Sequence, residues 1–353
     1  MINRKDFKKI KNDILNGPRL TVLLKHFEYI AQGKTQRVKN TVKPSDVFLS
    51  SDTELKKYYK VYKKNLGTFN HHGIASIPYV LEECLRTGVA INRYSRWKYK
   101  ESSDYLTFYG TSCADGTHAR TIAEYADGKI YTITDSPNAG NKKEFERLIN
   151  HKYSFFHLGS FADITPYYLK YKAPIFFRKG FDIIWENTTF QMHGNNRDDQ
   201  ISYIKRVLKN DGLIIFLEKM NNDNKKKYEE MEKIKDLKFK SKYFDVNDIK
   251  KKKTTILQEM EKGQVTLREF FKSLDKYFRY SCIIWNSTNF YEIVASNNKE
   301  SIEKFIYFLP NVYLPREFVY KNLNGSSRFE FHSRHLCFPE RRKRKGSHDE
   351  QPK

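Results

Sequence analysis

Between residues 104 and 295, short apolar runs alternate with segments whose apolar residues recur at helical spacing. Five runs predict strands, at 106–109, 129–134, 153–158, 181–185 and 213–217. Three segments between them predict helices, at 117–125, 141–150 and 198–208, with a turn at 210–212. Strands that alternate with helices form a parallel sheet covered by helices on both faces. Two later runs, at 280–285 and 290–295, have a short connection and predict an antiparallel hairpin.

Three further regions surround this alternating core. Residues 1–100 predict a helical region that covers the substrate, with helices at 5–15, 19–31, 53–62 and 74–87 and a polar turn at 68–73. We expect the last of these helices to end at Gly88. The α/β domain then spans 101–335 and contains a helical insertion at 221–278. Residues 336–353 form a basic tail that we expect to be disordered, since its residues 339–353 include no apolar side chain that could dock it.

The charge of the chain leaves two interpretations open. Its 353 residues include 65 Lys and Arg against 42 Asp and Glu, a net charge of +23. Such a field attracts RNA or another polyanion, whereas a Lys-rich composition is equally typical of a solvated surface. Four well-separated cysteines indicate neither a zinc site nor a disulfide framework, so we expect no metal and a reducing, cytoplasmic compartment. No apolar run is long enough to predict a membrane span.

The first predicted strand leads into Tyr-Gly-Thr-Ser-Cys-Ala-Asp-Gly-Thr at 109–117, and a helix follows. Small residues in such a turn let a ligand approach the backbone, and the start of the helix offers free N–H groups. Asp135 ends the second predicted strand, where a carboxylate can accept hydrogen bonds from both hydroxyls of a ribose. Together these features predict a nucleoside-type ligand.

At this point the sequence resembles the class I S-adenosylmethionine-dependent methyltransferases. The likeness covers the glycine-rich first motif at 106–117, the second strand at 130–135, the fourth-strand motif at 181–190 and Arg-Val-Leu-Lys-Asn-Asp-Gly-Leu at 206–213. The resemblance implies a Rossmann-like, seven-stranded, mostly parallel sheet with an antiparallel C-terminal hairpin. It also implies S-adenosylmethionine as cofactor. The implied cofactor contacts are Gly110, Thr111, Ser112, Asp115, Gly116, Asp135, Ser136, Ser160, Phe161 and Glu186.

The end of the fourth strand resembles two kinds of family member. Asn187-Thr188-Thr189-Phe190 stands where amino-methylating members carry Asn-Pro-Pro-Tyr or Asn-Pro-Pro-Phe, with both prolines replaced. Gln191-Met192-His193 instead resembles the His-containing loop of small-molecule methyltransferases. The resemblance implies His193, Glu186 and Asn187 as catalytic candidates. Alternatively, Phe190 is a core residue, His193 a surface loop residue and Glu186 a cap.

Candidate substrate contacts are Phe190 and the adjacent pair His71 and His72, of which at most one can line a given site. Most acceleration of methyl transfer can come from positioning, so a base is needed only if the acceptor must lose a proton. We expect methyl transfer to a small or conjugated metabolite. The alternatives are an RNA or protein methyltransferase that uses the basic termini, and a binding scaffold without activity.

Overall fold

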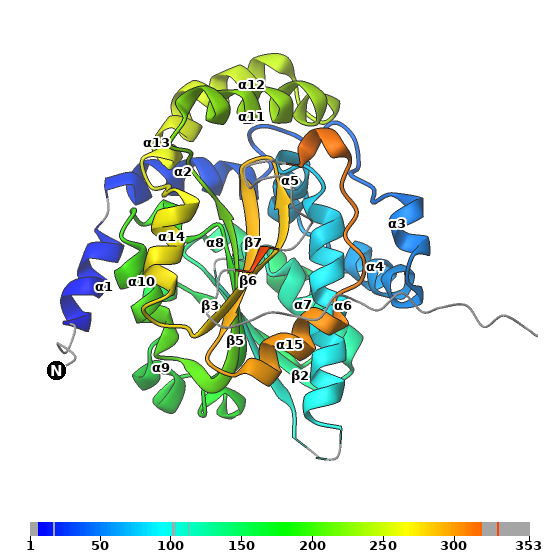
Figure 1. Cartoon of the computed structure of the whole chain (residues 1–353), viewed down its shortest axis with the longest axis vertical. Coiled ribbons are helices and arrows are strands. Elements are labelled where there is room, and N and C mark those ends of the chain that lie inside the picture. The colour runs from blue at the N-terminus through cyan, green and yellow to red at the C-terminus, as the bar shows by residue number, and fades with distance from the viewer. Residues whose placement is uncertain are drawn as a thin grey trace, which may run out of the picture.

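A computed structural model describes residues 6–16, 18–100, 102, 104–111, 113–319 and 330–331, and its centre is one eight-stranded sheet (Figure 1). The strands are β1 (Leu106–Thr111), β2 (Ile130–Ser136), β3 (Ser154–Leu158), β4 (Phe181–Asn187), β5 (Leu208–Lys219), β6 (Tyr280–Ser287), β7 (Phe290–Ser296) and β8 (Glu330–Phe331). Their order is β3-β2-β1-β4-β5-β7-β6-β8.

The pairing confirms the predicted seven-stranded sheet and adds one strand. Strands β1 to β5 are parallel, and β7 lies antiparallel between β5 and β6. The two-residue β8 pairs antiparallel with β6 and is too short for its sequence pattern to be recognised. Every residue of β1 is buried, as expected for a central strand covered on both faces.

Strand β5 corrects the prediction around residues 206–212. Helix α10 (Arg197–Lys205) ends earlier than predicted, and the expected turn at 210–212 is part of β5. The pairing of β5 with β4 shifts between Phe181, which faces Leu208, and Ile183, which faces Leu213. This irregularity takes up the extra residues within the strand, so the Asn-Asp-Gly signal does not turn the chain.

Helices cover both faces of the sheet (Figure 1). One face packs against α4 (Thr53–Asn65), α6 (Val80–Lys98), α7 (Thr117–Ala126) and α15 (Lys299–Phe308). The other packs against α1 (Phe7–Leu15), α9 (Pro166–Tyr171), α10 and α14 (Leu267–Leu274). The first layer includes α6, so part of the predicted cover region lies directly on the sheet.

Two local predictions in the N-terminal helical region were wrong. The expected polar turn at 68–73 is the first part of α5 (Thr68–Ser76), and α6 continues through Gly88 to Lys98. A Cβ at Gly88 would collide with the hydroxyl of Tyr58, so this glycine allows α4 and α6 to pack closely and does not end the helix.

The remaining helices lie outside these two sets. They are α2 (Pro18–Ala31), α3 (Asp46–Ser50), α5, α8 (Ala139–Leu148), α11 (Lys225–Lys238), α12 (Val246–Lys252), a π-helical turn (Lys253–Leu257) and α13 (Gln258–Glu261). The predicted insertion at 221–278 is thus largely helical, and α11 to α13 lie above the sheet in Figure 1.

Two further expectations from the sequence concern the basic tail and membrane spans. The tail at 336–353 lies outside the described residues. Among the described helices, none combines the length and apolar character that crossing a bilayer requires.

Candidate functional site

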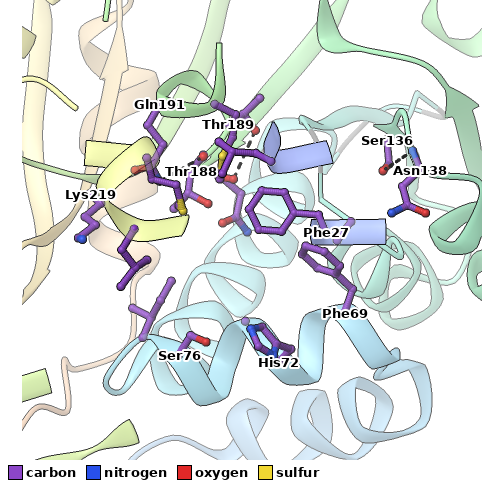
Figure 2. A pocket seen from close by; sticks show the side chains of 18 of the residues that line it. Phe27, Phe69, His72, Ser76, Ser136, Asn138, Thr188, Thr189, Gln191 and Lys219 are labelled. Atoms are coloured by element: carbon purple, nitrogen blue, oxygen red, sulfur yellow. Dashed lines mark hydrogen bonds between the residues drawn. The ribbon is translucent and has the colours of Figure 1, made fainter. Parts of the chain in front are cut away.

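A cavity of about 190 Å³ lies at the carboxyl ends of β1, β2, β4 and β5. Ser136 and Asn138 lie at one end of the view in Figure 2 and Lys219 at the other, with Thr188 between them. In open α/β sheets, ligands bind at this edge, where the strand order reverses. Here the reversal falls between β1 and β4, because β2 and β4 flank β1.

Three polar residues form what we call the amide end of the cavity: Ser136, Asn138 and Asn141. Asn138 caps α8, because its Oδ1 accepts a hydrogen bond from the Gly140 N–H at 2.8 Å. Asn141 donates from Nδ2 to Ser136 Oγ at 3.0 Å. Asn138 Nδ2 and Asn141 Oδ1 are buried and lack partners within the described part of the chain. The amide end therefore offers an unused donor and an unused acceptor, a set that suits ligand hydroxyls.

Asp135 lies behind this end and is not part of the cavity wall. Its Oδ1 accepts a hydrogen bond from the Tyr109 hydroxyl at 2.6 Å. Burial, and then the charge of Asp135, raises the pKa of Tyr109 well above its usual value, so the phenol stays a donor. Ribose binding by Asp135 stays a prediction, and its neighbour Ser136 reaches the cavity.

The predicted glycine-rich motif shapes the cavity more than it lines it. Of its described residues, Ala114 reaches the wall, with a left-handed φ of 48°. A Cβ at Gly110 would lie 2.7 Å from Cys113 Sγ. Gly116 has φ +77°, and a Cβ there would lie 2.5 Å from the Phe145 ring. A larger side chain at either position would collide with a neighbouring side chain, so both glycines allow the loop to pack closely.

Other predicted contacts in this region hold neighbouring elements together. Asp115 Oδ2 accepts a hydrogen bond from the Asn70 N–H at 2.7 Å, which joins the loop to α5. Thr111 Oγ1 lies 3.2 Å from Thr189 Oγ1 and joins β1 to the loop after β4. Ser112 lies outside the described residues.

The predicted contacts after β3 are also buried supports. Ser160 caps the short helix Phe161–Asp163, and its side chain accepts from the Ala162 N–H at 3.3 Å. Phe161 packs edge-on against the His193 ring, with centroids 5.0 Å apart. Neither Ser160 nor Phe161 is part of the cavity wall.

The three residues proposed for catalysis have different surroundings at the end of β4. Asn187 and His193 line the cavity, whereas Glu186 is fully buried behind the loop. Glu186 Oε1 accepts hydrogen bonds from the backbone N–H groups of Thr189 and Phe190, so it closes this turn. Burial, followed by the nearby charge of Glu218, raises the pKa of Glu186 well above its usual value.

His193 is buried, contrary to the alternative that made it a surface loop residue. Its Nδ1 lies 3.1 Å from the carbonyl oxygen of Ile14 in α1, so Nδ1 donates and Nε2 keeps its lone pair. Burial lowers the pKa of His193 to about 4, so the ring is neutral near pH 7. Phe190, proposed to contact substrate, is fully buried against Phe161 and lies outside the cavity wall.

The adjacent histidines of α5 face different surroundings. His72 lines the cavity, whereas His71 does not. His72 Nδ1 lies 3.3 Å from the Gln36 carbonyl oxygen, and its Nε2 lies 2.8 Å from Lys252 Nζ. We therefore assign the proton to Nδ1, which leaves Nε2 to accept from the lysine.

Sequence reasoning missed the opposite end of the cavity. Four lysines line it, and we call them the lysine end: Lys219, Lys235, Lys240 and Lys252. The run of four lysines at 250–253 is typical of a solvent-exposed face, yet Lys252 lines the cavity. The aromatic wall formed by Phe27 and Phe69, with centroids 5.7 Å apart, was also missed. The position of Lys219 at the end of the fifth predicted parallel strand was the available signal.

Comparisons with known proteins give similarities of shape only. No family model matches the sequence, and no curated protein matches it. Among solved structures, the plantazolicin methyltransferase BpumL in complex with monoazolic desmethylPZN analog and SAH is 10% identical, with 79% of this chain and 99% of that chain covered and a TM-score of 0.42.

Two other solved structures are similar over less of their own length. The cyclopropane synthase MmaA2 from Mycobacterium tuberculosis is 10% identical, covering 78% of this chain and 76% of that chain, with a TM-score of 0.38. The pyocyanin biosynthetic protein PhzM is 9% identical, covering 61% and 57%, with a TM-score of 0.35. At such scores the overlaps are loose, so function must be argued from this chain's own sheet and cavity.

Proposed function

We propose that this protein is an S-adenosylmethionine-dependent methyltransferase that acts on a small acceptor. The observation that carries the proposal is the pair of unpartnered amide atoms, Asn138 Nδ2 and Asn141 Oδ1, at the carboxyl end of β2. Nucleosides bind beside the second strand in sheets of this kind. The antiparallel β7 between β5 and β6 favours the methyltransferase arrangement over a dinucleotide-binding one, as the sequence resemblance implies.

The residues at this edge fit the cofactor. Asn138, Asn141 and Ser136 would hold its ribose hydroxyls, because together they offer donors and an acceptor. Ala114 borders the cavity with a small side chain, which leaves room beside the backbone. When bound, S-adenosylmethionine supplies a methyl group on a sulfonium, which an acceptor takes by in-line displacement.

The chain's own contribution is mainly to position the acceptor beside the end of β4. Asn187 offers an amide there, and His193 is neutral near pH 7 and offers an Nε2 lone pair as an acceptor, although its pKa of about 4 makes it a weak base. The carboxyl of Glu186 serves the turn through its contacts with Thr189 and Phe190. Positioning alone can supply a large share of the rate.

A small acceptor is favoured because the cavity is covered. Leu23, Phe27 and Phe69 from α2 and α5 line it, as do Lys235 and Met260 from the insertion. A nucleic-acid or protein methyltransferase and a scaffold without activity remain the alternatives, and the basic tail that would serve the first of these lies outside the described residues.

The test is calorimetry with S-adenosylhomocysteine on the full-length protein, followed by transfer of labelled methyl groups to lysate fractions. Asn138→Asp keeps the acceptor that caps α8 and removes the free donor, so affinity should fall about tenfold or more. Asn298→Asp is the matched control, since Asn298 caps α15 through Ser301 and is not part of the cavity wall.

Four outcomes separate the proposed function from its alternatives. A folded wild-type protein that does not bind S-adenosylhomocysteine contradicts the proposal. Equal losses in both variants would show that Asn138 acts only as a cap. Cofactor binding without methyl transfer to any fraction supports the scaffold, and RNase-sensitive product supports the nucleic-acid alternative.

A further inference from the structure

The lysine end gathers cations from distant parts of the chain inside one cavity. Lys219 ends β5, Lys235 lies on α11, Lys240 follows that helix and Lys252 ends α12. Lys219 and Lys235 are each 2% exposed and Lys240 is 4% exposed. Lysine is almost never fully buried unless it is paired, so the partners of these side chains decide what the cluster can do.

Carboxylates compensate only part of this charge. Glu232 Oε1 lies 3.1 Å from Lys219 Nζ and 2.5 Å from Lys235 Nζ. Asp236 Oδ1 lies 2.8 Å from Lys240 Nζ. Among the described residues, three of the four lysines thus share two carboxylates.

Lys252 is the member without an anionic partner. Its Nζ lies 2.8 Å from Nε2 of His72, a neutral acceptor, and within the described ranges no carboxylate forms an ion pair with it. Its side chain is half-buried, so water screens it only in part. The cavity therefore holds a lysine amine with no carboxylate from the described residues beside it.

The pKa values report the same imbalance. Burial, and then the charges of Lys240 and Lys235, lowers the pKa of Lys252 well below its usual value. Burial lowers the pKa of Lys235 to about 8, although Glu232 opposes this shift. An anion among these groups would supply the missing charge and raise both values.

Apolar side chains line the same cavity. Phe290 lies beside Lys235, whose Nζ is 5.3 Å from the ring centroid. Leu257 and Met260 add aliphatic surface from the insertion. A ligand that fills this space needs an apolar body as well as a charge.

We infer that the acceptor is an amphipathic oxyanion, a carboxylate or phosphate on an apolar body, whose charged group binds at the lysine end. The inference rests on the proposed function, which places the cofactor at the amide end. Because Lys219 and Ser136 lie at opposite ends with Thr188 between them, the anion anchors the acceptor while its reacting atom lies beside β4 (Figure 2).

The test measures binding of octanoate, octyl phosphate and octanol to the full-length protein by calorimetry, with and without S-adenosylhomocysteine. We expect the two anions to bind at least about tenfold more tightly than octanol, with uptake of protons near neutral pH because bound anions raise the lysine pKa values. The stronger of the two anions distinguishes a carboxylate from a phosphate acceptor.

Lys252→Met removes the unpaired cation without leaving a carboxylate alone. It should weaken both anions about tenfold or more and leave S-adenosylhomocysteine affinity within about twofold. Lys252→Arg should retain most anion binding, which guards against a folding defect. Lys233→Met, on the exposed side of α11, is the matched control and should change nothing.

Octanol that binds as tightly as octanoate overturns the inference, as does unchanged anion affinity in Lys252→Met. Absence of anion binding in a protein that binds S-adenosylhomocysteine also overturns it and leaves the proposed function intact. Failure to bind S-adenosylhomocysteine, with anion binding retained, contradicts the proposed function instead. Binding of a short RNA that depends on Lys252, without octanoate binding, would identify a nucleic acid as the anion and overturn the inference.

Discussion

The two ends of the cavity solve the burial of polar groups in opposite ways. At the amide end, Asn138 and Asn141 are neutral, and each leaves one atom without a partner. At the lysine end, charges are paired in part, and Glu232 joins Lys219 and Lys235. An orphaned amide atom costs about 1–3 kcal/mol and selects a ligand by hydrogen-bond geometry, whereas a lysine cluster short of carboxylates selects by charge. The two ends of one cavity therefore present different chemistry to a ligand.

The largest expected effect comes from removing the carboxylate that Lys219 and Lys235 share at the lysine end. Glu232→Gln should destabilise the protein by about 3 kcal/mol, because it leaves buried lysines without their shared carboxylate. Despite burial, which alone would raise it, the charges of Lys219, Lys235 and Lys240 hold the pKa of Glu232 well below its usual value. Denaturant unfolding near neutral pH measures the loss.

The pH dependence of that loss has a definite sign. Because the folded pKa of Glu232 is lowered, its contribution is complete above the unfolded value of about 4.3 and is lost as the pH falls through the folded value. The difference between wild type and Glu232→Gln should therefore shrink in acid. Glu230→Gln, exposed on the same helix, should show neither effect, and a similar loss there would contradict the role of the cluster.

The second prediction concerns the boundary between the two ends. His193→Gln should lower the methyl-transfer rate about tenfold and leave S-adenosylhomocysteine affinity unchanged, since its Nε2 can take a proton but positioning supplies most of the rate. With a pKa of about 4, His193 should give an acid limb near pH 4. A sequence-based expectation for an ordinary histidine lies between about pH 6 and 7.

The same lowered pKa has a consequence for stability. The folded protein binds fewer protons at His193 than the unfolded chain, so stability falls as the pH drops from about 6.5 toward about 4. His193→Gln should remove that part of the acid sensitivity. A rate profile with its limb above pH 6, or no change in the acid unfolding of the variant, would show that the ring is charged in the native protein.

A third prediction tests whether the two ends are independent. Asn141→Ala should weaken S-adenosylhomocysteine about tenfold, because it removes the free Oδ1, and leave octanoate unaffected. In the double variant with Lys252→Met, the loss of binding free energy for each ligand should match that of the single variant that affects it, within about 0.5 kcal/mol. Calorimetry on the two single variants and the double variant measures this, and a larger coupling would mean that both ends hold the same ligand.

The smallest effect is expected at His71. Its neighbour His72 contacts Lys252, whereas His71 is not part of the cavity wall. His71→Gln should change octanoate affinity less than about twofold, and His72→Phe, which removes the acceptor for Lys252, should change it more. Equal effects of the two substitutions would mean that α5 is rotated relative to the cavity.

The strands could be predicted because the buried strands of a parallel sheet form short, nearly continuous apolar runs in the sequence, such as 181–185. The sequence resemblance implied both Asp135 and Ser136 as cofactor contacts, and of the two only Ser136 reaches the cavity, because successive side chains of a strand face opposite sides. Lys252 could not be predicted. Its inward direction depends on His72, far away in the sequence, and a run of lysines carries no local sign of that contact.

The predicted helix end at Gly88 and the predicted turn at 210–212 were wrong for a similar reason. Each carries a strong local signal for a helix end or a turn, and tertiary packing overrides both. The contact of Tyr58 with Gly88 and the irregular pairing of β4 with β5 exist only in the folded chain. Local preference is a weak prior where such packing is available.

The wall of the lysine end is completed by Phe290, the first residue of β7. It lies at the carboxyl edge of the sheet because β7 is antiparallel to β5, so that Phe290 pairs with Lys219. During synthesis, a chain that has passed Lys252 and not yet reached Phe290 carries all four lysines without this wall. Contacts between segments so distant along the chain form late in folding. If the proposed anion site exists, binding of a fatty acid would thus report that the hairpin of β6 and β7 has joined the sheet.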